Sequence, residues 1–443
     1  MFGTDGVRGV ANRDLTPELA LALGRALGAR LGVGATVLVG RDTRRSGSML
    51  ESALAAGLAS VGVDVELGGV LPTPAVAELV SRGGATAGAV ISASHNPFPD
   101  NGIKLFGPDG FKLPDAEEAA VERGMHADGP RPEADALGAV VAWPEGRDRY
   151  LSGLLERFPI DLSSVRMVVD CAHGATVVSA PAVLRQLGAD LVEVIGATPD
   201  GVNINVDCGS AHLEALAEAV VRTGADLGLA FDGDGDRVLA VDHAGTPVDG
   251  DQILAILALR LRDRGELDGG AVVTTTMTNL GFRTAMRASG IEVRWTDVGD
   301  RYVLEEMRAG GFVIGGEQSG HLINLRSGPT GDGLAAGLQL LHAVVESGRS
   351  LADLASVVVR MPQKLVSFPV ARKDRLPGAD EVWAMVAACE RELGHDGRVV
   401  VRASGTEPLV RVMVEAPTEE ACSRWCASIA EVAERVLGGN ARE

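Results

Sequence analysis

The fold is decided by a short β-branched run, Ala35-Thr-Val-Leu-Val39, which precedes an Ala- and Leu-rich stretch and the run Gly62-Val-Asp-Val65. Continuous apolar runs of this kind are typical of strands that are buried on both faces. The Ala- and Leu-rich stretch predicts a helix, and Gly62 supplies the positive φ that ends a helix. These segments together predict a strand–helix–strand unit with two parallel strands.

The same pattern occurs twice more along the chain. Val165–Val169 leads to Gly188–Leu191, and Ala271–Thr275 leads to Gly290–Val293. The final part of the chain differs, since it predicts a strand at 364–370, a helix at 381–393, a hairpin of 398–402 with 409–415, and a closing helix at 419–437. We therefore expect an α/β protein: three related α/β domains with mixed or parallel sheets, plus a smaller C-terminal α+β domain, around a central cleft.

The length of the chain agrees with this division. Its 443 residues are about three times the ~150 residues typical of one domain, and single cores stop growing at roughly 250–300 residues. We place the domains at 1–145, 146–243, 244–360 and 361–443. Each of them is expected to carry one functional loop.

Composition excludes several classes of partner. A net charge of −19 argues against nucleic acid and against an anionic membrane. The 4 Trp, 2 Tyr and 9 Phe are too few for base-stacking surfaces. No apolar run is long enough to predict a transmembrane helix, and the opening residues Met1–Gly6 lack the features of a signal peptide.

The five cysteines form a sparse, odd-numbered set in a long chain, which is typical of reduced thiols in a cytoplasmic protein. Cys422 and Cys426 would share one helix face, but no second pair of Cys or His flanks them. We therefore interpret them as structural rather than as zinc ligands.

The first candidate functional loop is Ser92-Ala-Ser94-His95-Asn96-Pro97, which follows the apolar run Ala87–Ile91. A small polar loop after a strand presents its hydroxyl groups at the carboxyl end of a sheet, where α/β proteins place their sites. The alternative is an ordinary turn, because Asn-Pro ends many strands. No Gly-x-Ser-x-Gly motif surrounds Ser94, so a hydrolase triad is not indicated.

The second loop, Asp232-Gly-Asp234-Gly-Asp236-Arg237, follows the apolar run Leu227–Phe231. Three alternate carboxylates can converge on one hard cation, and oxygen-only ligands favour Mg²⁺ or Ca²⁺ over zinc. An EF-hand is excluded because Arg237 and His243 stand where that loop needs Gly and Glu. The cluster therefore predicts a metal site, and Arg237 beside it suggests that an anion binds there as well.

Two further loops carry groups suited to a phosphorylated sugar. Gly316–His321 contains Glu317, Ser319 and His321 between glycines, a set that fits a polyol. Arg402–Pro408 combines Arg402, Ser404, Gly405 and Thr406, and Arg411 lies on the next strand. Such groups are the parts of an anion-binding loop. Ordinary turns remain the alternative for both loops.

Taken together and in this order, the four loops resemble those of the α-D-phosphohexomutase family, and the resemblance covers essentially the whole chain. It is similar to the branch of that family that acts on glucosamine phosphates. The segments that carry the resemblance are Phe2–Gly9, Pro199–Asn205, Gly299–Val303, Glu317–His321 and Gly405–Pro408. Gln318 and Gly405 in particular favour this branch over the branches that act on glucose or mannose phosphates.

The resemblance implies an isomerase that interconverts glucosamine 6-phosphate and glucosamine 1-phosphate. Ser94 would carry a phosphoryl group, and one Mg²⁺ would join it to Asp232, Asp234 and Asp236. A 1,6-bisphosphate would be both intermediate and activator, and a phosphoryl donor or kinase would first phosphorylate Ser94. The product would feed UDP-N-acetylglucosamine and peptidoglycan precursor synthesis, and the protein is a possible homodimer.

The resemblance also implies roles for the remaining residues. Lys104 would be the general acid/base, with a pKa lowered by its cationic surroundings. His321, Arg8 and Arg237 would assist at the same centre, and Glu317 and Ser319 would hold sugar hydroxyls. The phosphate that does not react would be held by Arg402, Ser404, Gly405, Thr406 and Arg411.

Three alternatives stay open. The same chemistry could act on glucose or mannose phosphates, or the chain could be a non-catalytic protein that binds sugar phosphates. A phosphatase would differ only in admitting water to the phosphoserine. The combination of Ser94, Lys104 and three aspartates argues against a simple binding protein, because binding alone does not need them together.

Overall fold

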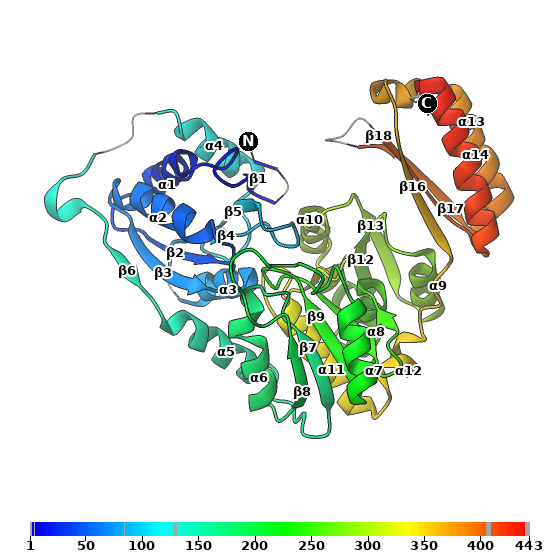
Figure 1. The fold of residues 1–443 in the computed structure, drawn as a ribbon, viewed down its shortest axis with the longest axis horizontal. Helices are drawn as coiled ribbons and strands as arrows, with labels where there is room; N and C mark the ends of the chain where they lie inside the picture. The colour runs from blue at the N-terminus through cyan, green and yellow to red at the C-terminus, as the bar shows by residue number, and fades with distance from the viewer. Residues whose placement is uncertain (1, 4, 84, 128–130, 405–408, 439–443) are drawn as a thin grey trace. The chain divides into compact units, whose positions relative to one another are not determined.

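The computed structural model describes residues 2–3, 5–83, 85–127, 131–404 and 409–438 of the chain. Contacts divide it into two compact units: residues 1–277 with 291–357, and residues 278–290 with 358–443 (Figure 1). The larger unit holds three α/β sheets and the smaller unit holds one antiparallel sheet. The expected fold class of α/β domains followed by a small α+β domain is confirmed, whereas the predicted domain boundaries stay a prediction.

The first sheet of the larger unit has six strands. In spatial order they are β1 (Val7–Val10), β5 (Asp100–Phe106), β4 (Ala87–Ile91), β2 (Thr36–Arg41), β3 (Asp64–Val70) and β6 (Val140–Ala142). Its helices are α1 (Pro17–Leu31), α2 (Gly47–Ala59), α3 (Thr73–Gly83), α4 (Asp115–Gly124) and α5 (Glu145–Arg157). Val37 and Val39 of β2 pack in one buried cluster with Leu23 of α1 and Leu54 of α2, so alternate residues of β2 anchor the helices to one face of the sheet.

The second and third sheets have five and four strands. The second contains β11 (Pro247–Val248), β10 (Val238–Asp242), β9 (Leu227–Phe231), β7 (Arg166–Asp170) and β8 (Asp190–Ile195), with helices α6 (Ala180–Gln186) and α7 (Glu214–Thr223). The third contains β13 (Glu292–Thr296), β12 (Ala271–Thr275), β14 (Ile314–Gly316) and β15 (Leu322–Asn324). The helices that follow along this part of the chain are α8 (Gly250–Asp263), α10 (Asp300–Gly310), α11 (Gly333–Ser347) and α12 (Leu351–Ala355).

All three predicted strand–helix–strand units are confirmed. The strand pairs β2–β3, β7–β8 and β12–β13 are parallel. The glycines expected to end the connecting helices have positive φ angles: 86° at Gly62, 93° at Gly188 and 72° at Gly290. Glycine adopts this conformation without the steric cost that a Cβ would impose.

The smaller unit is built on three antiparallel strands. Its elements are α9 (Leu280–Ala288), β16 (Gln363–Pro369), α13 (Asp380–Leu393), β17 (Arg398–Ala403), β18 (Leu409–Glu415) and α14 (Glu419–Leu437), with the strand order β16-β18-β17. Its core includes Cys389, Cys422 and Cys426. All five cysteines of the chain are free and buried, which agrees with the structural role expected for Cys422 and Cys426.

No helix in the described part of the chain is long and apolar enough to cross a membrane.

Candidate active site

The loop that carries Ser94 begins where β4 ends. Since β4 lies parallel to β2, the loops that follow the two strands leave the same edge of the sheet, and Ser92 Oγ donates to Asp42 Oδ2 at 2.7 Å. Ser94 is buried, with only 1% of its surface exposed. Its hydroxyl lies 2.5 Å from Asp232 Oδ2, so the structure joins the predicted serine and aspartate loops directly.

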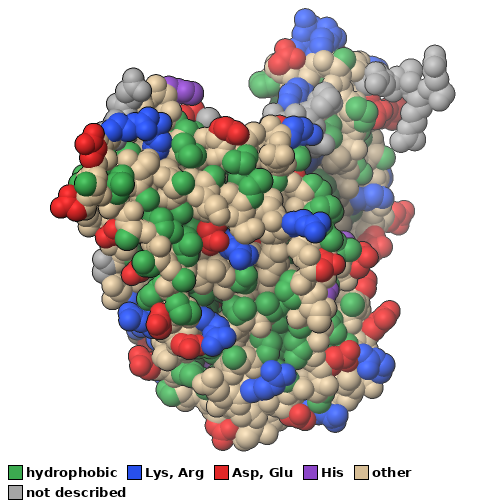
Figure 2. Space-filling view, turned by 60° about the vertical axis from the view of Figure 1, so that its left-hand side comes forward, with side chains coloured by type: hydrophobic (Ala, Val, Ile, Leu, Met, Phe, Trp, Pro, Cys, Tyr) green, Lys and Arg blue, Asp and Glu red, His purple; other side chains and the backbone are tan. Residues whose placement is uncertain are grey.

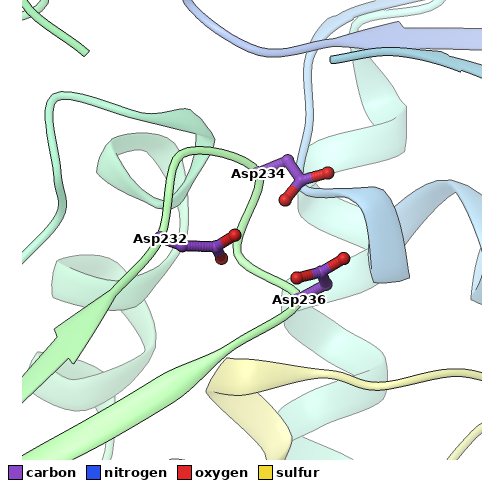
Figure 3. Close-up of side chains that lie close together, drawn as sticks. All are labelled: Asp232, Asp234 and Asp236. Carbon is purple, nitrogen blue, oxygen red and sulfur yellow. The ribbon is translucent and has the colours of Figure 1, made fainter. Parts of the chain in front are cut away.

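The aspartate loop connects β9 to the antiparallel strand β10. Asp232, Asp234 and Asp236 are all buried, and one oxygen of each lies within 4.8 Å of the others (Figure 3). Asp234 Oδ1 is buried and accepts no hydrogen bond within the described residues. Three clustered carboxylates, one of them with a buried oxygen that accepts no hydrogen bond in the described residues, fit a hard divalent cation.

Among the described residues, Lys104 of β5 is the cation closest to this cluster. Its Nζ lies 2.9 Å from Asp234 Oδ2 and 3.3 Å from Asp236 Oδ2. Although burial opposes the charge of Lys104, Asp234, Asp5 and Asp236 hold its pKa well above the usual range. The lowered pKa was expected for Lys104 beside a bound cation and stays a prediction; in the metal-free chain these carboxylates shift the pKa in the opposite direction.

The pKa values of two of the three aspartates shift in opposite directions. Burial and the neighbouring charges of Asp236 and Asp234 raise the pKa of Asp232 well above its usual range. Burial also acts on Asp236, but Lys104 and His321 hold the pKa of that carboxyl well below its usual range. Without a metal, Asp232 is thus the aspartate that favours a proton and Asp236 the one that stays ionised.

His321 reaches the cluster from the β14–β15 loop. Its Nδ1 lies 3.6 Å from Asp236 Oδ1, and burial is outweighed by Asp236, so the pKa of His321 rises to about 8. The backbone holds this loop against the aspartate loop, because Arg237 and His321 form a β-bridge and Val238 N donates to Gly320 O at 3.1 Å. Arg237 Nε is 3.8 Å from Asp236 Oδ1.

The predicted residue Arg8 lies beside the serine loop. Its guanidinium pairs with Asp5 and donates to Asn96 Oδ1 at 3.5 Å. His95 Nδ1 is 3.4 Å from Ser94 Oγ. Burial, Arg237 and Arg8 lower the pKa of His95 to about 4, so this imidazole is neutral at pH 7.

A second cation behind the site was missed by sequence reasoning. Lys112 Nζ lies 2.6 Å from both Asp5 Oδ1 and Asp300 Oδ2, and Asp300 Oδ2 is 3.6 Å from His321 Nε2. Asp5 and Asp300 belong to the segments Phe2–Gly9 and Gly299–Val303 that carry the family resemblance, which was the available signal. No pattern in the sequence pointed to Lys112.

Thr73 was missed as well. Its Oγ1 donates to Asp234 Oδ2 at 2.6 Å, and its backbone N–H donates to Asp234 O at 2.8 Å. Thr73 is the first residue of α3, so this helix start fixes both the backbone and the side chain of Asp234.

The predicted sugar-binding residues lie in the β14–β15 loop with His321. Glu317 Oε1 accepts from Gly299 N at 3.1 Å. Ser319 Oγ is buried without a hydrogen-bond partner in the described residues. Gln318 instead faces the start of α8, where its amide donates to Asp249 Oδ2 at 3.3 Å and its backbone carbonyl accepts from Gly250 N at 3.0 Å. These contacts hold the loop against α8.

The predicted phosphate-binding residues belong to the smaller unit. Arg402 and Arg411 face each other in the register of β17 and β18, and Ser404 is buried at the end of β17. Lys373, which sequence reasoning missed, donates to Ser404 O at 2.7 Å. Gly405 and Thr406 lie outside the described residues.

The surface charge is mixed in sign. On the face drawn in Figure 2, acidic and basic side chains are interspersed and neither sign forms a continuous field. The buried site, in contrast, gathers at least three cationic side chains near its aspartates.

Four family models match successive parts of the chain. They describe the phosphoglucomutase/phosphomannomutase α/β/α domain I at residues 1–131, domain II at 148–245 and domain III at 249–361, and the C-terminal domain of the same family at 365–432.

Similar proteins cover almost the whole length. A phosphoglucosamine mutase of Mycolicibacterium vanbaalenii is 52% identical over 437 residues, 97% of this chain and 98% of the relative. One from Saccharopolyspora erythraea is 53% identical, covering 98% of each. Among solved structures, a phosphoglucomutase/phosphomannomutase family protein of Burkholderia thailandensis matches with a TM-score of 0.83 and 25% identity over 99% of both chains. A putative phosphomannomutase of Thermus thermophilus matches with a TM-score of 0.78 and 27% identity, covering 97% and 98%.

Proposed function

Because the chain belongs to the phosphoglucomutase/phosphomannomutase family, we propose that it is an isomerase that interconverts glucosamine 6-phosphate and glucosamine 1-phosphate. The observation that carries this proposal is the 2.5 Å contact between Ser94 Oγ and the buried three-aspartate cluster. A serine held this way can take up and return a phosphoryl group. The choice of glucosamine rests on the relatives named phosphoglucosamine mutase that share about half of their residues with this chain.

The reaction begins with a phosphoryl group on Ser94. The 1-hydroxyl of glucosamine 6-phosphate attacks that phosphorus, the bond from phosphorus to Ser94 Oγ breaks, and glucosamine 1,6-bisphosphate forms. The bisphosphate turns within the site, its 6-phosphoryl group passes to Ser94 Oγ, and glucosamine 1-phosphate leaves. No phosphate is gained or lost in the cycle, so traces of the bisphosphate or a phosphoryl donor suffice to prime Ser94.

Asp232, Asp234 and Asp236 would hold a divalent cation, for which we propose Mg²⁺. The bound cation would neutralise charge on the phosphoryl group during transfer, which is the chief need of this chemistry. The oxygen-only ligands and the free lone pair of Asp234 Oδ1 support this assignment.

Lys104 and His321 supply the proton chemistry in this proposal. The carboxylates around Lys104 favour its protonated form, which is the form that donates to Ser94 Oγ as that oxygen leaves phosphorus. His321 lies beside Asp236 Oδ1, whereas Lys104 lies beside Oδ2 of the same carboxylate, and His321 would exchange the proton of the sugar hydroxyl. Glu317 and Ser319 would orient the sugar, and Arg402, Ser404 and Arg411 would bind the phosphate that is not reacting.

A coupled assay tests the function and its specificity together. Glucosamine 6-phosphate, glucose 6-phosphate and mannose 6-phosphate are compared with Mg²⁺, with and without trace 1,6-bisphosphate. We expect glucosamine 6-phosphate to turn over fastest, and S94A to lose turnover. Equal rates on all three sugars would leave only the family assignment, full turnover by S94A would refute the phosphoserine, and release of inorganic phosphate as the main product would indicate a phosphatase.

A further inference from the structure

The backbone of the serine loop adopts an unusual conformation at its central residue. Ser94 has φ of +51°, in the left-handed region that few residues other than glycine enter. Its N–H donates to Ser92 Oγ at 2.9 Å. Such a conformation persists only when surrounding contacts determine it, so the groups that hold this loop also determine where the Ser94 hydroxyl points.

Arg44 is the first of these groups. It follows β2, is 1% exposed, and donates to three carbonyls of the serine loop. Its Nη1 lies 2.6 Å from Pro97 O, and its Nη2 lies 2.9 Å from Ser94 O and 2.8 Å from Asn96 O. A guanidinium suits this role because its donors form a rigid planar fork, whereas the donors of lysine diverge from one nitrogen.

Asp42 fixes the orientation of that fork. Its Oδ2 accepts from Arg44 Nε at 2.9 Å and from Ser92 Oγ at 2.7 Å, and its Oδ1 accepts from Arg44 N at 2.8 Å. The buried positive charge is thus paired with a buried negative charge, as burial requires. The Nη1 and Nη2 donors of Arg44, which do not bind Asp42, bind the carbonyls of the serine loop.

Asn205 holds the same loop from a distant part of the chain. Its Nδ2 lies 2.9 Å from Ser94 O and 3.2 Å from Asn96 O, and it is 9% exposed. It also has a positive φ, 59°, and its N–H donates to Ala172 O at 2.9 Å, which anchors it to the loop after β7. Two separate donors therefore grip the carbonyl of Ser94 itself.

We propose that Arg44 and Asn205 are positioning residues that hold Ser94 in its left-handed conformation and so aim Oγ at Asp232. Both side chains donate to backbone carbonyls of the serine loop, including that of Ser94. Loss of either would let the peptide after Ser94 rotate, which misplaces Oγ. As this rests on the proposed function, the consequence is slower phosphoryl transfer and a larger share of phosphoserine lost to water, with substrate binding preserved.

The test uses the full-length enzyme with two variants and two matched controls. N205A removes one of the two donors to Ser94 O, and R44K keeps the charge but loses the planar set of donors. N203A is the control for N205A, because Asn203 lies in the same loop and donates to Thr198 O instead. R45K is the control for R44K, because Arg45 is the adjacent residue and is exposed.

We expect kcat of N205A and R44K to fall by about 10- to 100-fold, as for a misplacement of about 1 Å, with KM within about two-fold of wild type. The ratio of phosphoenzyme hydrolysis to phosphoryl transfer, followed with ³²P-labelled enzyme, should rise in both, and both controls should match wild type. Unchanged kcat and an unchanged ratio in N205A would overturn the proposal, as would a fall in kcat with an unchanged ratio, which indicates general destabilisation. If R44K does not fold, N205A alone decides.

Hydrogen exchange separates this proposal from the proposed function. The amides of Ser94 and Asn96 should exchange faster in N205A than in N203A whether or not the enzyme turns over sugar phosphates. Wild type that never acquires label on Ser94 would refute the proposed function while leaving the exchange result to judge the positioning role. Equal exchange in N205A and wild type would refute the positioning role by itself.

Discussion

Replacing Asp232 by asparagine should stabilise the metal-free protein while it abolishes activity. Burial and the charges of Asp236 and Asp234 raise the pKa of Asp232, so its ionised form is unfavourable in the fold. Asparagine keeps the shape of the side chain and removes that charge. Asp236 provides the matched comparison, because Lys104 and His321 hold its pKa low; the fold favours its charge, and D236N should destabilise the metal-free protein.

The magnitude follows from the geometry. Carboxylate oxygens up to 4.8 Å apart repel by about 3.5 kcal/mol per pair at an effective dielectric constant of about 20. Asp232 can avoid this by taking up a proton, which costs about 1.4 kcal/mol for each pH unit above its ordinary pKa of 3.8. Because protonation of Asp232 costs less than repulsion from both neighbouring carboxylates, Asp232 lowers the free energy of unfolding by at most about 4 kcal/mol at pH 7. Arg237 offsets part of this destabilisation. We therefore expect D232N to raise the free energy of unfolding by about 1–3 kcal/mol at pH 7.

The sign of the pH dependence is fixed by the raised pKa. Between pH 4 and 7 the folded protein binds more protons at Asp232 than the unfolded chain does, so this residue lowers stability progressively as pH rises. The advantage of D232N over wild type should therefore be small at pH 5 and larger at pH 7. Differential scanning calorimetry in EDTA at both pH values measures it through Tm.

The same Tm measurements are then repeated with Mg²⁺ added. Added Mg²⁺ should raise the Tm of wild type, because a ligand that binds only the folded protein stabilises it, and should leave both variants nearly unchanged. Two results would refute the reasoning: D232N and D236N shifting the metal-free Tm in the same direction, or wild type showing no response to millimolar Mg²⁺.

Three further changes test other parts of the larger unit. Burial raises the pKa of Glu78 to about 7, so this residue lowers stability as pH rises from 4.5 to 7, and E78Q should raise Tm relative to wild type more at pH 7 than at pH 4.5. Y150F removes the hydroxyl that lies 3.1 Å from both oxygens of Asp332 and should cost about 1.5–3 kcal/mol in urea denaturation. In G57A the new Cβ would lie 2.3 Å from a backbone oxygen of α1, so α1 and α2 must separate at a cost of about 1–3 kcal/mol; G83A, which meets nothing within 4 Å, should change Tm little.

Sequence reasoning reached the strands and the loops because these signals are local. The apolar runs that end at Ile91 and Phe231 are strands β4 and β9 as expected, and the polar residues that follow them meet at Ser94 and Asp232. A continuous apolar run followed by small polar residues has few other structural solutions in an α/β protein.

Contacts between distant segments were beyond that reasoning. The sign of the pKa shift at Lys104 depends on Asp5, 99 positions away in sequence, and on Asp234, 130 positions away. Likewise, nothing in the local sequence of Asn205 indicates that its amide grips the carbonyl of Ser94. Such properties come from the packing of separate loops, which hydrophobic periodicity does not encode.

The same long-range contacts explain how a buried, highly charged site is held together within one unit. Thr73 ties α3 to Asp234, Asn205 ties the 199–207 loop to Ser94, and the pairing of Val238 with Gly320 ties the aspartate loop to the loop of His321. Each of these ties is a hydrogen bond that satisfies a polar group inside the protein. Because the groups proposed to react all lie in the larger unit, their geometry is preorganised by contacts inside that unit alone. The groups proposed to bind the phosphate that is not reacting lie in the smaller unit, whereas Glu317 and Ser319, proposed to bind the sugar, lie in the larger unit with the reacting groups.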